Sequence, residues 1–163
     1  MNAEYMKKLS SEEFFEKAEP WLKKAISNPA IDLRKVAALV QSRCEILSDL
    51  PERVDFIDTL PDYEPELYIH KKSKTNLENS LETLEVLLPI LQAQEDWSNE
   101  ALYEKLVAIA TDRGVKNSVI LWPLRVAVSG KASTPGGATE LCALLGKEES
   151  LARIEKGIAL LRK

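Results

Sequence analysis

The chain has 163 residues, a formal net charge of −4 and 45% hydrophobic residues, enough for one ordinary domain or two small subdomains with a filled core. This composition argues against a disordered chain. The negative charge argues against a protein that coats nucleic acid by bulk attraction. No apolar run reaches the ~18 to 20 residues of a membrane span, and the first residues lack a signal-peptide pattern, so we expect a cytosolic protein.

Helical periodicity dominates the sequence, and alternation typical of strands is scarce. Ser10 or Ser11, followed by two glutamates, predicts the start of a first helix that closes at Pro29. A second helix is predicted from about Asp32 to Leu47, with Cys44 in its apolar stripe. Apolar spacing predicts further helices near residues 77–91, 98–113, 119–129, 135–145 and 151–161. We therefore predict an all-α fold.

Single residues predict several helix ends in the second half of the chain. Ser98 is suited to an N-cap, Gly114 to a left-handed C-cap, and the following helix should end near Gly130. Thr134 and Pro135 are typical of an N-cap followed by proline at the first helical position.

The stretch from Pro51 to Pro65 is the best candidate for a boundary between two helical subdomains. Between Glu52 and Glu66, six acidic residues stand against one base. We predict a first helical subdomain at residues 1–60 and a second at 61–163.

Enzyme signatures are incomplete throughout the sequence. There is no glycine-rich phosphate loop and no paired cysteine or histidine spacing for zinc, so we expect no catalytic residue, metal or cofactor in this chain. The single histidine, His70, stands beside Lys71 and Lys72 and is predicted to be a solvated surface residue. Cys44 and Cys142 lie in apolar stripes and are expected to be buried free thiols rather than a disulfide.

The segment from Arg113 to Thr139 contains four bases and no acid. It offers a helix with Trp122 and, three residues later, Arg125, then a loop that presents backbone amides at the start of another helix. Such a helix start favours phosphates or base edges. On spacing alone, an ordinary connection between two helices is the preferred interpretation of this segment, and a surface for phosphates or bases is the alternative.

Four stretches carry a resemblance: residues 2–5, 92–97, 122–137 and 144–148. Together they resemble the C-terminal region of bacterial glutamyl-tRNA synthetases. The combination of Pro-Leu-Arg, Ser-Gly and Thr-Pro-Gly at these separations is specific, and the resemblance spans essentially the whole chain.

The resemblance implies an all-α, two-subdomain helical bundle, the alpha-helical cage of the class I aminoacyl-tRNA synthetase anticodon-binding type. It implies that the partner is the anticodon loop of a glutamate tRNA. It also implies a catalytic domain of the same polypeptide before Met1, which would hold ATP and glutamate, so the chain alone should not charge tRNA.

Roles are carried over one residue at a time. The resemblance gives Arg43 the reading of the third anticodon base, although an arginine that covers the edge of an apolar stripe fits this position too. Arg125 resembles an anticodon-contacting arginine, and Trp122 could stack a base or fill the core. The loop that packs against splayed anticodon bases is matched by Thr134, Pro135, Gly137 and Ala138.

Two other classes of function compete with this interpretation. A helical protein-interaction scaffold would use exposed grooves for a partner helix. Measuring affinity at several salt concentrations distinguishes this scaffold from an RNA-binding protein. RNA affinity falls steeply with ionic strength, whereas the affinity of an apolar helix-in-groove complex changes little. A small hydrolase is disfavoured because the sequence shows no catalytic nucleophile paired with a general base.

Overall fold

The computed structural model describes residues 3–42, 44 and 46–163. Within them it contains nine α-helices, two short 3-10 helices and no strand beyond a single bridge between His70 and Thr75. The all-α prediction is confirmed. The chain separates into two compact units, Met1–Leu60 with Ser133–Gly136 and Pro61–Ala132 with Gly137–Lys163. No helix in the described part of the chain is long and apolar enough to cross a bilayer.

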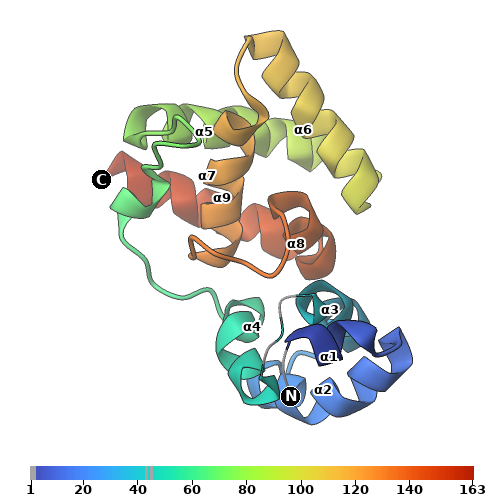
Figure 1. Cartoon of the computed structure of the whole chain (residues 1–163). Helices are drawn as coiled ribbons and strands as arrows, with labels where there is room; N and C mark the ends of the chain where they lie inside the picture. The colour runs from blue at the N-terminus through green and yellow to red at the C-terminus, as the bar shows by residue number, and fades with distance from the viewer. Residues whose placement is uncertain (1–2, 43, 45) are drawn as a thin grey trace. The chain divides into compact units, whose positions relative to one another are not determined.

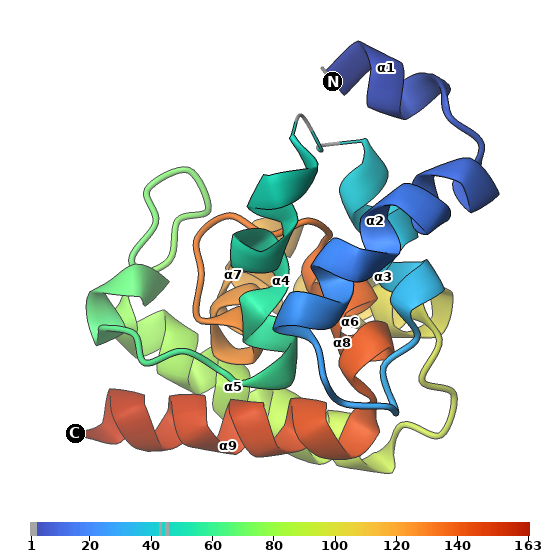
Figure 2. The same cartoon turned by 90° about the horizontal axis from the view of Figure 1, so that it is seen from below.

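The first unit consists of α1 (Ala3–Lys8), α2 (Ser11–Ala25), α3 (Leu33–Gln41), η1 (Leu47–Asp49) and α4 (Leu50–Asp58), as Figures 1 and 2 show. Helix α2 packs against both α3 and α4. The core between these helices is built from apolar residues at helical spacing, namely Phe14, Ala18, Leu22, Val36, Val40, Val54 and Ile57.

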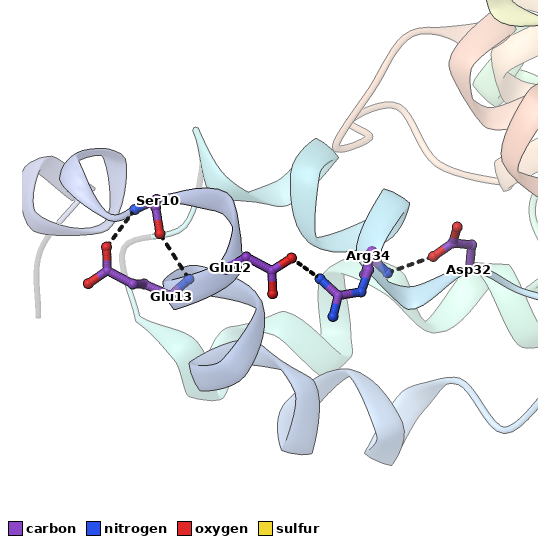
Figure 3. A network of polar contacts seen from close by, with 5 residues as sticks. All are labelled: Ser10, Glu12, Glu13, Asp32 and Arg34. Carbon is purple, nitrogen blue, oxygen red and sulfur yellow. Dashed lines mark hydrogen bonds and ion pairs between the residues drawn. The ribbon is translucent and has the colours of Figure 1, made fainter.

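Side chains fix the starts of α2 and α3 (Figure 3). The Ser10 hydroxyl accepts a hydrogen bond from the Glu13 amide at 3.2 Å, and the Glu13 carboxylate accepts one from the Ser10 amide at 3.1 Å. The Asp32 carboxylate accepts from the Arg34 amide at 3.0 Å. The Arg34 guanidinium pairs with Glu12, which connects the two helix starts. The predicted start at Ser10 is thus confirmed as a capping box.

Two predicted helix ends in this unit are wrong. Helix α2 ends at Ala25 rather than Pro29, because Ile26 takes an extended conformation. Helix α3 ends at Gln41 rather than Leu47, and Cys44 is buried beyond that end. The apolar periodicity continues across the break, so the sequence pattern does not reveal it. Arg43, expected on this helix, lies outside the described residues.

Asp58 at the end of α4 ties α4 to the segment that follows α2. Its carboxylate accepts hydrogen bonds from the Ser27 hydroxyl at 2.7 Å, the Ser27 amide at 3.1 Å and the Asn28 amide at 3.0 Å. These donors, the Ser27 hydroxyl foremost, hold the pKa of Asp58 below its usual value.

A group whose pKa is lowered by folding stabilises the protein above its unfolded-state pKa of about 3.9, and this contribution is lost as the pH falls through the folded-state value. We therefore expect Asp58→Asn to lower the free energy of unfolding by on the order of 1 kcal/mol at neutral pH. The difference from the parent protein should shrink below about pH 4. Urea unfolding followed by circular dichroism at several pH values measures both, and a difference independent of pH would contradict the assignment.

The second unit consists of η2 (Pro65–Tyr68), α5 (Leu77–Ala93), α6 (Asn99–Arg113), α7 (Asn117–Ser129), α8 (Ala138–Leu145) and α9 (Lys147–Arg162). Helices α5 and α9 lie side by side in both views (Figures 1 and 2), and α7 packs against α5, α6, α8 and α9. Helix α7 is therefore central to the unit, and its buried residues include Ile120, Leu124, Val126, Ala127 and Val128.

Most predicted helix ends of the second unit agree with the structure. The Ser98 hydroxyl accepts from the Ala101 amide at 3.2 Å, and Gly114 and Gly130 end α6 and α7 with left-handed φ angles of 68° and 66°. The prediction for Thr134 and Pro135 is wrong. Helix α8 begins at Ala138, and the Thr134 hydroxyl instead donates within its own loop to the carbonyl of Gly136 at 2.5 Å.

Buried polar groups connect α7 and α9. Arg153 of α9 is only 2% exposed, and its guanidinium donates to the Val128 carbonyl at 2.6 Å near the end of α7.

Cys142 and Cys44 are both free and buried, as predicted. Burial raises the pKa of the Cys142 thiol to about 12, so this thiol stays protonated at neutral pH.

Candidate functional site

A cavity of about 710 Å³ lies in the second unit beside α7, and we call it the α7 cavity. Its walls come from the turn before α5, from one side of α6, from the first half of α7 and from the start of α8. It is lined by His70, Ser73, Asn99, Tyr103, Asn117, Ser118, Leu121, Trp122, Arg125 and residues 137–140. Its volume lies in the range of pockets that hold small organic groups.

Trp122 and His70 form a stacked aromatic pair in the wall of this cavity. Their ring centroids are 3.8 Å apart and the planes differ by 10°. The Trp122 indole also donates a hydrogen bond to the Leu67 carbonyl at 3.2 Å, and the His70 Nδ1 lies 2.8 Å from the Ser73 hydroxyl. Trp122 is thus only partly buried, and its ring is held in place by these two contacts. Because His70 covers one of its faces, a further ring can stack only on the other face or on His70.

His70 is half-buried against Trp122, so the prediction of a solvated surface histidine is wrong. Its stacking partner, Trp122, lies 52 positions later in the chain. No local pattern indicates such a pair. Only the fold brings the turn before α5 against the start of α7.

Arg125 lies one helical turn after Trp122 and also lines the cavity. Its guanidinium carbon is 5.8 Å from the centre of the Trp122 ring, within the range of a cation–π contact. Packing beside the Trp122 ring limits the orientations of the Arg125 guanidinium. A guanidinium held in this way is suited to binding planar hydrogen-bond acceptors.

Amide and hydroxyl groups complete the polar lining. The Thr139 hydroxyl donates to the Asn99 side-chain oxygen at 2.6 Å, and Asn117 contributes a second amide. Tyr103 is 47% exposed, which is unusual for a large aromatic residue. An aromatic wall with a few hydrogen-bonding groups can receive a flat, polar heterocycle, because rings stack on its faces and amides bond to its edges.

The start of α8 forms the last wall, and it differs from the expected free set of amides. The Glu140 carboxylate accepts a hydrogen bond from the Gly137 amide at 3.0 Å, so an acid of the same helix already occupies part of this helix start. A phosphate would compete with this carboxylate. We therefore expect this wall to contact an uncharged part of a ligand and not a phosphate.

The structure brings together four of the predicted site residues, namely Trp122, Arg125, Gly137 and Ala138, in the lining of one cavity. Thr134 and Pro135 belong to the other compact unit, and Arg43 lies outside the described residues. Sequence reasoning missed His70, Asn99, Tyr103 and Asn117. Tyr103, which stands outside the apolar stripe of Leu102, Leu106 and Ile109, is a local signal that could have indicated the α6 wall.

Comparison with known proteins gives a consistent likeness. The model of a family described as an anticodon binding domain matches residues 13–158. The chain is 48% identical over 162 residues to a glutamate–tRNA ligase of Clostridium tetani, covering 99% of this chain and 33% of that protein. It is 50% identical over 162 residues to the glutamate–tRNA ligase of Clostridium kluyveri, with the same coverage. The chain thus spans about a third of the length of these relatives.

Solved structures give the same likeness in fold. A glutamate tRNA ligase from Elizabethkingia meningosepticum, in complex with its amino acid, matches with a TM-score of 0.78 at 21% identity. This match covers 98% of this chain and 31% of that one. The glutamate-tRNA synthetase of Elizabethkingia anophelis gives 0.74 at 21% identity, with 97% and 30% covered. The resemblance identified from the four sequence stretches is confirmed by these matches.

Proposed function

Because the chain belongs to the family of anticodon-binding domains, we propose that it is the anticodon-binding module of a glutamate–tRNA ligase and binds the anticodon loop of a glutamate tRNA. The observation that carries the proposal is the α7 cavity, where four residues singled out from the sequence line one aromatic and polar wall. Anticodon bases leave the stack when a protein reads them, and such bases bind by stacking and by hydrogen bonds to their edges.

In this proposal one unstacked base enters the α7 cavity. Its ring stacks on the Trp122–His70 pair, and the Arg125 guanidinium donates to carbonyl oxygens on its edge. Thr139 and Asn99 supply neutral hydrogen-bonding groups elsewhere in the lining. For Thr134 and Pro135, which belong to the other compact unit, we propose the role that the resemblance implies, namely packing against splayed anticodon bases.

The chemical step belongs, in this proposal, to a catalytic domain of the same polypeptide that binds ATP and glutamate. The residues of the α7 cavity would only hold the anticodon. Charging of tRNA takes place in the cytoplasm, and the proposed function implies that location for the protein.

Direct binding tests the proposal. A fluorescent RNA hairpin that carries the anticodon stem and loop of a glutamate tRNA is titrated with the purified chain and followed by anisotropy. We expect weak, saturable and salt-dependent binding, because a separated module lacks the effective concentration that a covalent partner supplies. A hairpin with the same stem and an unrelated anticodon should bind at least tenfold more weakly, a difference of about 1.4 kcal/mol. Equal affinity for the two hairpins contradicts the proposal.

A further inference from the structure

Four lysines gather at one end of the second unit, in the turn before α5 and at the start of α7. Lys71, Lys72 and Lys74 lie in the turn of residues 70–75, which we call the lysine turn, and Lys116 directly precedes α7. All four side chains are exposed, and none forms an ion pair with a carboxylate in the described part of the chain. The lysine turn and residues 114–118 contain no acidic residue.

Many hydrogen bonds fix the backbone of the lysine turn. The His70 and Thr75 backbones exchange two bonds, at 3.2 and 3.1 Å, and the Thr75 hydroxyl donates to the Tyr68 carbonyl at 2.7 Å. The Ser118 hydroxyl donates to the Ser73 carbonyl at 3.3 Å, which connects the turn to the start of α7. The lysines therefore project from a rigid turn and not from a loose loop.

Lys74 has a backbone φ of 59°, and among the described residues it is the sole non-glycine with a positive φ. A lysine in this left-handed region is strained relative to glycine or asparagine, which adopt it readily. Strain of this kind is tolerated where the side chain serves a purpose that a relaxed residue would not. Lys74 thus stands at a position where glycine would be less strained.

The lysine turn stands between two cavities. Ser73 lines the α7 cavity, whereas the next residue, Lys74, lines a second cavity of about 710 Å³ together with Lys116 and Arg113. Glu82 also lines the second cavity, but it pairs with Arg113. This leaves Lys74 and Lys116 as unneutralised charges at the rim next to the proposed base site.

We propose that the lysine turn and Lys116 contact the phosphate groups of the RNA strand whose base enters the α7 cavity. The inference rests on the proposed function. A base in the cavity places its own sugar and phosphates at the rim, and unpaired lysines attract phosphates without reading sequence. These contacts position the strand, while Trp122 and Arg125 read the base. They also explain how an acidic protein holds RNA, since the attraction is local and not a property of the net charge.

The test removes the charges and follows affinity against salt. The variant Lys71→Gln/Lys72→Gln/Lys116→Gln should weaken binding of the glutamate anticodon hairpin roughly tenfold at low salt, and should reduce the log–log salt slope by roughly 2, at about 0.7 per phosphate contact. It should weaken the hairpin with the unrelated anticodon by the same factor, because phosphates carry no sequence information. The matched control Lys105→Gln/Lys156→Gln/Lys163→Gln removes equal charge from exposed residues that line neither cavity.

Lys74→Gly separates a binding role from a structural one. Glycine relieves the positive φ, so the melting temperature should stay the same or rise, while RNA affinity at low salt should fall several-fold. If both variants keep the parent's salt slope and affinity while the two hairpins are still discriminated, the lysine turn does not contact the strand and the proposed function stands. An equal loss in the matched control would also overturn the inference. If neither hairpin binds the parent chain, both the proposed function and the inference fail.

Discussion

Gly157→Ala should destabilise the second unit by about 1 to 3 kcal/mol, the usual cost of adding a methyl group to a filled core. A Cβ at Gly157 of α9 would lie 2.5 Å from the Tyr68 hydroxyl oxygen and 3.2 Å from Leu84 Cδ1. Tyr68 cannot move aside easily, because it is fully buried and its hydroxyl lies 2.7 Å from that of Tyr63. Thermal and urea unfolding followed by circular dichroism measure the loss.

A second substitution tests whether this contact is the cause. Tyr68→Phe removes the hydroxyl that the new methyl group would meet, although alone it costs stability by leaving the Tyr63 hydroxyl without this partner. The double variant Gly157→Ala/Tyr68→Phe should therefore be more stable than the sum of the two single losses predicts, with a coupling of about 0.5 to 3 kcal/mol. Additive losses would show that α9 is disturbed elsewhere. Gly114→Ala cannot serve as a control, because its φ of 68° adds strain of its own.

The sequence predicts seven of the nine described α-helices, α2, α3 and α5 to α9, because their determinants are local, whereas α1 and α4 are not predicted. The capping box at Ser10 and the left-handed glycines at 114 and 130 involve residues within one helical turn, so spacing alone indicates them. The predicted helix ends are wrong where the same residues suit two local structures. Thr134 before Pro135 suits a helix start, but its hydroxyl bonds within the loop to the Gly136 carbonyl, and α8 starts three residues after Pro135.

The candidate site is predicted in part, for the same reason. Trp122 and Arg125 are neighbours on one helix, and the spacing of three places them together. The remaining walls come from α6, the start of α8 and the lysine turn, which only tertiary packing brings to α7. His70 illustrates the difference: beside Lys71 and Lys72 it has the context of a surface residue, and its stacking on Trp122 is invisible in the local sequence.

Arg125→Gln should lower affinity for the glutamate anticodon hairpin by roughly 10- to 100-fold, the size expected when one good base contact of about 1 to 3 kcal/mol is lost. Glutamine keeps a planar hydrogen-bonding end but has no charge and a shorter reach, so it cannot reproduce the guanidinium beside Trp122. Anisotropy titrations are normalised to the folded fraction measured by circular dichroism, because Arg125 also packs within the fold. Arg162→Gln is the matched control, since Arg162 is an exposed arginine of α9 that pairs with Glu85 and lines neither cavity.

The same titrations distinguish the role of Arg125 from that of Arg43. The resemblance implies that Arg43 reads the third anticodon base. Arg43→Gln should reduce the ratio of affinities for two hairpins that differ only in that base, by a factor corresponding to about 1 to 3 kcal/mol. Arg125→Gln should leave this ratio nearly unchanged while weakening both hairpins, because its base enters the α7 cavity and is the same in both. If Arg125→Gln behaves like Arg162→Gln, the α7 cavity is not a base site. If Arg43→Gln leaves the ratio intact, the selectivity for the third base comes from other residues.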